Sequence, residues 1–112
     1  MNYYDELDPE TGQTYRIPLL EFLGSGSAED FATRNKDVLI RSLANAIEIL
    51  VNQRLQRVPI FTIREADLVF YLDRKELDQS MNQCIEYFTE IEEYEECIKL
   101  NNLKKKKDEK FK

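Results

Sequence analysis

The spacing of apolar and polar residues predicts a mainly helical chain. The clearest pattern runs from Val38 to Leu55, where apolar residues recur every three or four positions without an interrupting Gly or Pro. It predicts a central core helix over residues 36–56, which must end before Pro59 because the residue preceding a proline resists helical backbone angles. The apolar positions of this helix are Leu39, Leu43, Ala46, Ile47, Leu50, Val51 and Leu55.

A second helical pattern covers residues 74–103. Asp73 and Glu76 have the spacing of a capping box, which satisfies free backbone N–H groups at the start of a helix. Periodicity alone permits one long helix or two helices folded into a hairpin, since no Gly or Pro lies near Ile91. The apolar positions are Leu77, Met81, Cys84, Ile85 and Phe88, followed by Ile91, Tyr94, Cys97 and Ile98.

A resemblance favours the hairpin. The run Leu77-x3-Met81-x2-Cys84-Ile85, followed by Glu93-Tyr94-Glu95-x-Cys97-x2-Leu100, resembles the UVR motif, a small helical hairpin of the excision-repair subunits UvrB and UvrC. Both cysteines stand where that family usually has Ala, the connection 86–92 is longer, and Asn101 replaces the usual Arg. In that family the hairpin packs against a second copy or a partner's hairpin, so the resemblance implies protein contact.

The remaining segments predict shorter elements. Thr62 and Glu65 have the spacing of another capping box and predict a helix over residues 63–72. The segment 58–63 is β-branched and aromatic, and Pro59 within it predicts an edge strand or an extended crossover. Asp8–Gly12 has the composition of a turn and predicts a marginal two-stranded ribbon between residues 3–7 and 15–17.

The expected fold class is therefore mainly α: a small helical domain with a C-terminal antiparallel helical hairpin and a minor β-hairpin or extended N-terminal arm. We divide the chain into an N-terminal arm and flexible joint (1–26), a helical domain (27–103) and a disordered Lys-rich tail (104–112). The arm contains an apolar cluster that requires burial, and Ser27 with Asp30 can begin a helix. That cluster is Leu19, Leu20, Phe22 and Leu23.

Length and composition predict one domain, since the chain has 112 residues and 42% of them are hydrophobic. No apolar run approaches the length of a membrane span, and residues 1–5 lack the features of a signal peptide. The two cysteines, Cys84 and Cys97, lie on apolar helix faces, which is typical of reduced thiols, so we expect a cytoplasmic protein. The net charge of −6 is distributed in blocks: residues 65–98 carry eleven acids and two bases, and residues 34–64 carry six bases and two acids.

The residue types offer little catalytic chemistry. The chain has no His, which is the commonest general base and metal ligand, and two Cys are too few for a zinc site. The run Gly24–Ser27 lacks the Lys-Ser/Thr ending of a phosphate-binding loop. We therefore expect no enzyme activity, no cofactor, no metal site and no small-molecule substrate.

The favoured function is that of a small accessory or adaptor protein, which binds another protein or itself as part of a larger assembly. The expected contact residues are aromatic, because rigid rings bury much area at low entropic cost: Tyr3, Tyr4, Tyr15, Tyr87, Phe88 and Tyr94. The alternative is an accessory factor on nucleic acid, using Arg41, Arg54, Arg57, Lys104, Lys105, Lys106 and Lys107. A third reading is nucleic-acid mimicry by Glu86, Glu90, Glu92, Glu93, Glu95 and Glu96.

Overall fold

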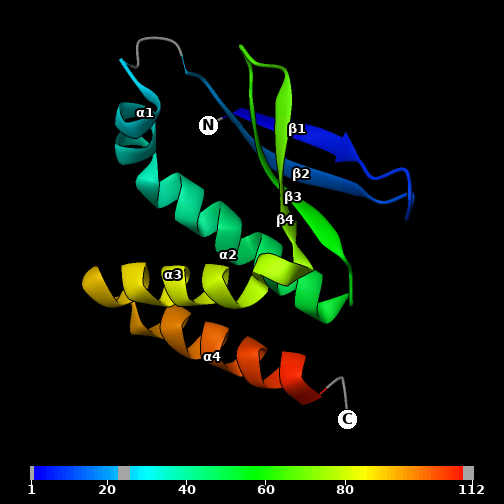
Figure 1. The fold of residues 1–112 in the computed structure, drawn as a ribbon, viewed down its shortest axis with the longest axis vertical. Coiled ribbons are helices and arrows are strands. Elements are labelled where there is room, and N and C mark those ends of the chain that lie inside the picture. Colours follow the sequence, from blue (N-terminus) through cyan, green and yellow to red (C-terminus); the bar gives the residue numbers. More distant parts are fainter. Residues whose placement is uncertain (1, 23–25, 110–112) are drawn as a thin grey trace.

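The computed structural model describes residues 2–22 and 26–109 and shows an α+β domain (Figure 1). Four strands form one mixed sheet in the order β1-β2-β3-β4. The predicted mainly α, all-helical class is therefore wrong, because the β structure is a full sheet and not a minor hairpin. The elements are β1 (Asn2–Leu7), β2 (Thr14–Leu20), α1 (Ala28–Arg34), α2 (Lys36–Asn52), β3 (Arg57–Ile63), β4 (Leu68–Asp73), a 3-10 turn η1 (Arg74–Glu76), α3 (Leu77–Glu90) and α4 (Tyr94–Glu109).

The N-terminal ribbon forms as predicted and becomes half of the sheet. β1 and β2 pair antiparallel, with Tyr4 opposite Ile17, and Gly12 adopts a φ of +76° in the turn between them. That left-handed conformation is one that glycine adopts without steric cost. The ribbon is stable because β2 also pairs with β3, so the two strands are not an isolated hairpin.

The helices α1 and α2 connect the parallel strands β2 and β3. Ser27 caps α1, as predicted, because its hydroxyl oxygen accepts a hydrogen bond from the Asp30 N–H at 3.1 Å. β3 pairs parallel with β2 and antiparallel with β4, so it is a central strand and not the predicted edge strand. Pro59 is tolerated because β2 pairs with β3 only near residues 62–63, and a bulge follows the proline.

The predicted helix over 63–72 is a β-hairpin. Thr62 and Glu65 do not form a capping box: the Thr62 hydroxyl donates to the Leu68 carbonyl at 2.7 Å, and the Glu65 carboxylate accepts the Phe22 N–H at 2.8 Å. Asp67 turns the chain with a φ of +48°. The run that follows is rich in Val, Phe and Tyr, residue types that favour strands once a neighbouring strand is present.

The core helix α2 ends at Asn52, four residues before the predicted end. Arg54 has a φ of +55°, and the Leu55 N–H bonds to the Leu50 carbonyl at 3.0 Å. These are the marks of a Schellman motif, which terminates a helix by satisfying its last carbonyl groups. The left-handed position of this motif is usually Gly. Here it is Arg54, so the sequence contains no sign that the helix ends at this point.

The segment 77–109 is a helical hairpin, as the sequence predicts, and not one long helix (Figure 1). α3 also ends in a Schellman motif: Glu92 has a φ of +60°, and the Glu93 N–H bonds to the Phe88 carbonyl at 2.8 Å. The predicted capping box at Asp73 is absent, because the Asp73 side chain makes no capping hydrogen bond and a 3-10 turn precedes α3. α4 continues through the lysine run to Glu109, so residues 104–109 are helical and not disordered.

The main hydrophobic core lies where α2, α3, α4 and the strands β3 and β4 meet. Its fully enclosed side chains include Ile47, Leu50, Val58, Met81 and Phe88. A smaller core at the other end of α2 holds Leu20, Phe31 and Ile63, joined by two stacked aromatic pairs, Phe22–Phe31 and Phe61–Phe70. The predicted arm cluster is thus buried at Leu20 and half-buried at Leu19 and Phe22. Leu23 and the Gly24–Ser25 part of the predicted joint fall outside the described residues, as do residues 110–112.

Candidate protein-interaction site

The exposed large apolar side chains gather on two surfaces. Seven such side chains occur among residues 2–22 and 26–109, and only Leu68 stands apart from the two groups. The first group, the β1 surface, lies along the edge strand β1 and consists of Tyr3 and Leu7 on one face of the sheet and Tyr4 on the opposite face. The second, the hairpin tip, consists of Ile91, Tyr94 and Ile98. Figure 1 shows these surfaces far apart, with β1 at the upper right and the turn between α3 and α4 at the left.

The hairpin tip is built by the turn and the first part of α4. Tyr94 is 56% exposed and Ile98 is 61% exposed, and their spacing of four residues places them on one side of the helix. Ile91, at 39% exposed, is the C-cap residue directly after α3. The buried side of α4 is formed by Cys97, Leu100 and Leu103 instead, which leaves Tyr94 and Ile98 facing solvent.

The predicted contact residues therefore separate into two classes. Tyr94 lies at the hairpin tip, and Tyr3 and Tyr4 lie on the β1 surface. Phe88 is completely enclosed, and Tyr15 is 7% exposed, so both are core residues. Sequence reasoning missed Ile91 and Ile98 because it assigned them to the buried stripe. The alternative stripe Cys97, Leu100, Leu103 was the signal that could have separated them.

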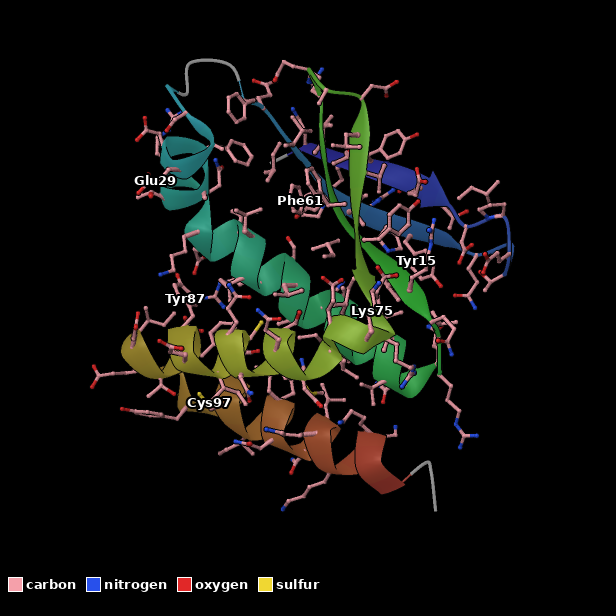
Figure 2. The ribbon with its side chains drawn as sticks, in the orientation of Figure 1. Tyr15, Glu29, Phe61, Lys75, Tyr87 and Cys97 are labelled. Atoms are coloured by element: carbon pink, nitrogen blue, oxygen red, sulfur yellow. The ribbon has the colours of Figure 1, made fainter. Side chains whose placement is uncertain are left out.

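An ion-pair and hydrogen-bond network holds the tip against α2. Arg41 donates to the Asp37 carboxylate through Nε at 2.9 Å and binds the Glu93 carboxylate through both terminal nitrogens. The Tyr87 hydroxyl donates to the other oxygen of Asp37 at 2.8 Å. Figure 2 shows Tyr87 on the side of α3 that faces α2. Tyr87 is thus half-buried and occupied by this contact, although it was predicted to contact a partner.

The electrostatics of this network follow from its geometry. Hydrogen bonds from Arg41 and then Tyr87 lower the pKa of Asp37, because they stabilise the carboxylate form. The same bond to Asp37 raises the pKa of Tyr87, since ionising the phenol would place two negative charges together. The pKa of Arg41 is raised, first by Glu93 and then by Asp37. Asp37 and Arg41 are therefore charged at neutral pH, while the Tyr87 phenol keeps its proton, and the network fixes the direction in which α4 leaves the turn.

The β1 surface is the free edge of the sheet, because β1 has only β2 as a neighbour. Asp5 is neutralised by Arg16, with Oδ1 and Nε 3.1 Å apart. Glu6 accepts a hydrogen bond from the Tyr71 hydroxyl at 2.9 Å. Tyr3 lines a groove of about 310 Å³ between the ribbon and α2, which Arg41 also reaches. The groove therefore brings together Tyr3, which was predicted to contact a protein, and Arg41, which was predicted to contact nucleic acid.

The predicted nucleic-acid residues do not form one continuous stripe. Arg41 belongs to the network below the hairpin tip, and Arg57 lies over the ring of Tyr71 at 4.0 Å. The lysine run gathers near the end of α2 and the first half of α3 instead. Its contacts are Lys104 with Asn82 at 3.1 Å, Lys106 with Asn52 at 2.6 Å and Lys107 with Asp78 at 2.6 Å; Lys105 is exposed, as is Arg54 just beyond α2.

The two thiols are buried and reduced, and Figure 2 shows Cys97 where α3 and α4 meet. Burial raises the pKa of Cys84 to about 12, so this thiol is protonated at neutral pH and is a poor nucleophile. In the part of the chain that the structure describes, no three side chains are grouped to hold a metal ion. No helix there is both long and apolar enough to cross a membrane.

The fold and its surfaces define a class: a small α+β domain that presents a projecting helical hairpin with an apolar tip. Comparison of the chain with protein-family models, curated proteins and solved structures gives no match.

Proposed function

We propose that this protein is a small cytoplasmic adaptor that binds another protein through its hairpin tip, with the β1 surface as a second contact. One observation carries the proposal: three of the seven exposed large apolar side chains in the described segments lie within residues 91–98 at the hairpin tip. Single exposed apolar residues are ordinary on any protein, whereas their grouping is typical of interaction sites. Tyr is also among the residue types that contribute most to binding energy at interfaces.

The rigidity of the tip supports the same conclusion. The network of Arg41 with Glu93 and Asp37 ties the turn to α2, so Tyr94 is presented by an ordered helix. A preorganised surface loses little conformational entropy when it binds, which favours affinity.

Site-specific photo-crosslinking tests this function. A photoreactive phenylalanine at position 94 should give a specific adduct with one protein in an extract of the native cells. The same residue at position 68 is the matched control, because Leu68 is also exposed (49%) but lies outside both surfaces. Equal labelling from positions 94 and 68, or no adduct from position 94, would show that the tip has no protein partner.

A second candidate function is an accessory role on nucleic acid. The observation that favours it is the contact of Lys106 with Asn52, which brings the lysine run close to Arg54. A labelled duplex or single strand should then bind with an affinity that falls steeply as salt is added, and Lys105→Gln should reduce that slope. Binding that is absent at low salt excludes this function.

A further inference from the structure

The segment that forms the hairpin tip carries several acidic side chains beside its apolar residues, and one of them, Glu96, lines the groove between α2 and α4. The acids are Glu86, Glu90, Glu92, Glu95 and Glu96, all within eleven positions of one another. None of the five makes an ion pair with another described residue. Glu93, in contrast, is neutralised by Arg41. Some acids elsewhere are paired, namely Asp5 with Arg16, Glu21 with Arg64, Glu48 with Lys99 and Asp78 with Lys107.

Part of this charge is unfavourable to the isolated fold. Glu86 and Glu90 lie in the last part of α3, where the helix dipole is negative, and the last turn contains no basic residue. Acidic side chains at that end of a helix destabilise it. A cationic partner at the tip would remove both the repulsion among the glutamates and the conflict with the dipole.

We infer that the partner of the hairpin tip is a basic amphipathic helix, with large apolar side chains flanked by Lys or Arg. This inference rests on the proposed function. An apolar centre with a charged rim is the usual organisation of an interface, and the sign of the rim selects the partner.

The size and charge of the patch favour this occupant over a whole domain or a second copy. Its three apolar side chains expose on the order of 300 Å², which is well below the roughly 800 Å² that each partner contributes to a standard interface. The patch therefore fits a short segment better than a whole domain. A symmetric dimer through the tip would place two acidic segments against each other, which costs energy that the small apolar area does not return.

Three labelled synthetic helices test the inference by fluorescence anisotropy with the whole protein. The first peptide has a Leu stripe flanked by Lys, the second has Glu in place of Lys, and the third keeps Lys but has Ser in place of Leu. The Leu/Lys peptide should bind with a Kd in the micromolar range. The other two should bind at least about 10-fold more weakly, because each lacks one half of the complementarity.

Variants of the protein separate the two contributions. Tyr94→Ser should weaken binding of the Leu/Lys peptide about 10-fold at any salt concentration, since it removes apolar contact. The triple change E90Q/E92Q/E95Q should weaken it roughly 5-fold at 50 mM salt and have little effect at 500 mM, because exposed charges are screened. Leu68→Ser should leave the affinity unchanged.

Three results would overturn the inference. The first is equal binding of the Lys and Glu peptides, and the second is no binding of the Leu/Lys peptide at 1 mM. The third is concentration-dependent self-association that Tyr94→Ser abolishes, since the occupant would then be a second copy. Mass spectrometry of the photo-adduct at position 94 separates this failure from failure of the proposed function: an adduct on an acidic or neutral segment rejects the basic helix but retains the adaptor.

Discussion

Truncation of Phe88 tests whether this ring is part of the core or part of a binding surface. The sequence placed Phe88 both on the apolar stripe of a helix and among the candidate contact residues, and the structure encloses the ring completely between α2, α3 and α4. Its ring packs edge-on against Tyr87, with centroids 5.6 Å apart, and the Arg41 guanidinium lies 5.4 Å from its centroid. Phe88→Ala should therefore destabilise the whole domain and not only weaken binding.

The expected magnitude follows from the packing. Replacing a buried Phe by Ala costs about 3–5 kcal/mol, from lost transfer energy and from the space left behind. Phe88 borders a groove of about 220 Å³ between α2 and α4, so part of that space opens to an existing groove and does not become a closed void. We therefore expect a loss near the lower end, about 3 kcal/mol, which is a large part of the roughly 5–15 kcal/mol that stabilises a typical domain.

Urea denaturation followed by far-ultraviolet circular dichroism measures this loss, and the chain has no Trp to serve as a fluorescence probe. With a typical urea dependence of about 2 kcal/mol per molar, the midpoint should fall by about 1.5 M. Tyr94→Ala is the matched control. Its side chain is exposed, so the free energy of unfolding should change by less than about 0.5 kcal/mol. A loss below about 1 kcal/mol for Phe88→Ala would refute the enclosed position of the ring.

Three further outcomes are expected from local features. Glu92→Gly should raise the free energy of unfolding by about 1 kcal/mol, because glycine adopts the left-handed conformation freely. Glu86→Gly, at an exposed position inside α3, should lower it by about the same amount, and the same sign for both would contradict the turn. Arg74→Met should lower the free energy of unfolding, measured by urea denaturation, by about 2 kcal/mol. The reason is that the Arg74 guanidinium donates to the Leu55 carbonyl at 2.9 Å and to the Leu50 carbonyl at 3.2 Å. Lys75→Met is the control and should leave the stability unchanged. The Cys84 thiol keeps its proton in the folded state from pH 9.0 to about 12, whereas the unfolded chain loses it. Stability should therefore fall with rising pH above about 9 more steeply in the wild type than in Cys84→Ala, and parallel pH profiles would show that the thiol is not buried.

Local sequence signals located several elements correctly. The spacing of apolar residues predicted α2 from its first residue, and the turn residues at Asp8–Gly12 predicted the ribbon. The prediction of a hairpin over residues 74–103 was also confirmed in its location. These features depend on neighbours within one or two turns of chain, which a single sequence displays directly.

Only the tertiary structure decided the fold class. The segment 63–72 has a helix-like capping pattern, yet it forms a strand because β3 offers it hydrogen-bond partners and a buried face. The same context makes β3 central although it contains Pro59, because the pairing with β2 avoids that position. Strand pairing joins residues that are distant in the chain, so local propensity cannot decide it.

The residues of the candidate site also depend partly on the sequence and partly on the tertiary structure. The sequence alone determined that acidic and aromatic residues are concentrated around residues 86–98, because composition does not depend on folding. The tertiary structure decided which of them face outward: Phe88 enters the core, while Tyr94 and Ile98 remain in solvent. The physical reason is the angle at which α4 packs, which is set by the left-handed turn at Glu92 and by the ion pair between Arg41 and Glu93.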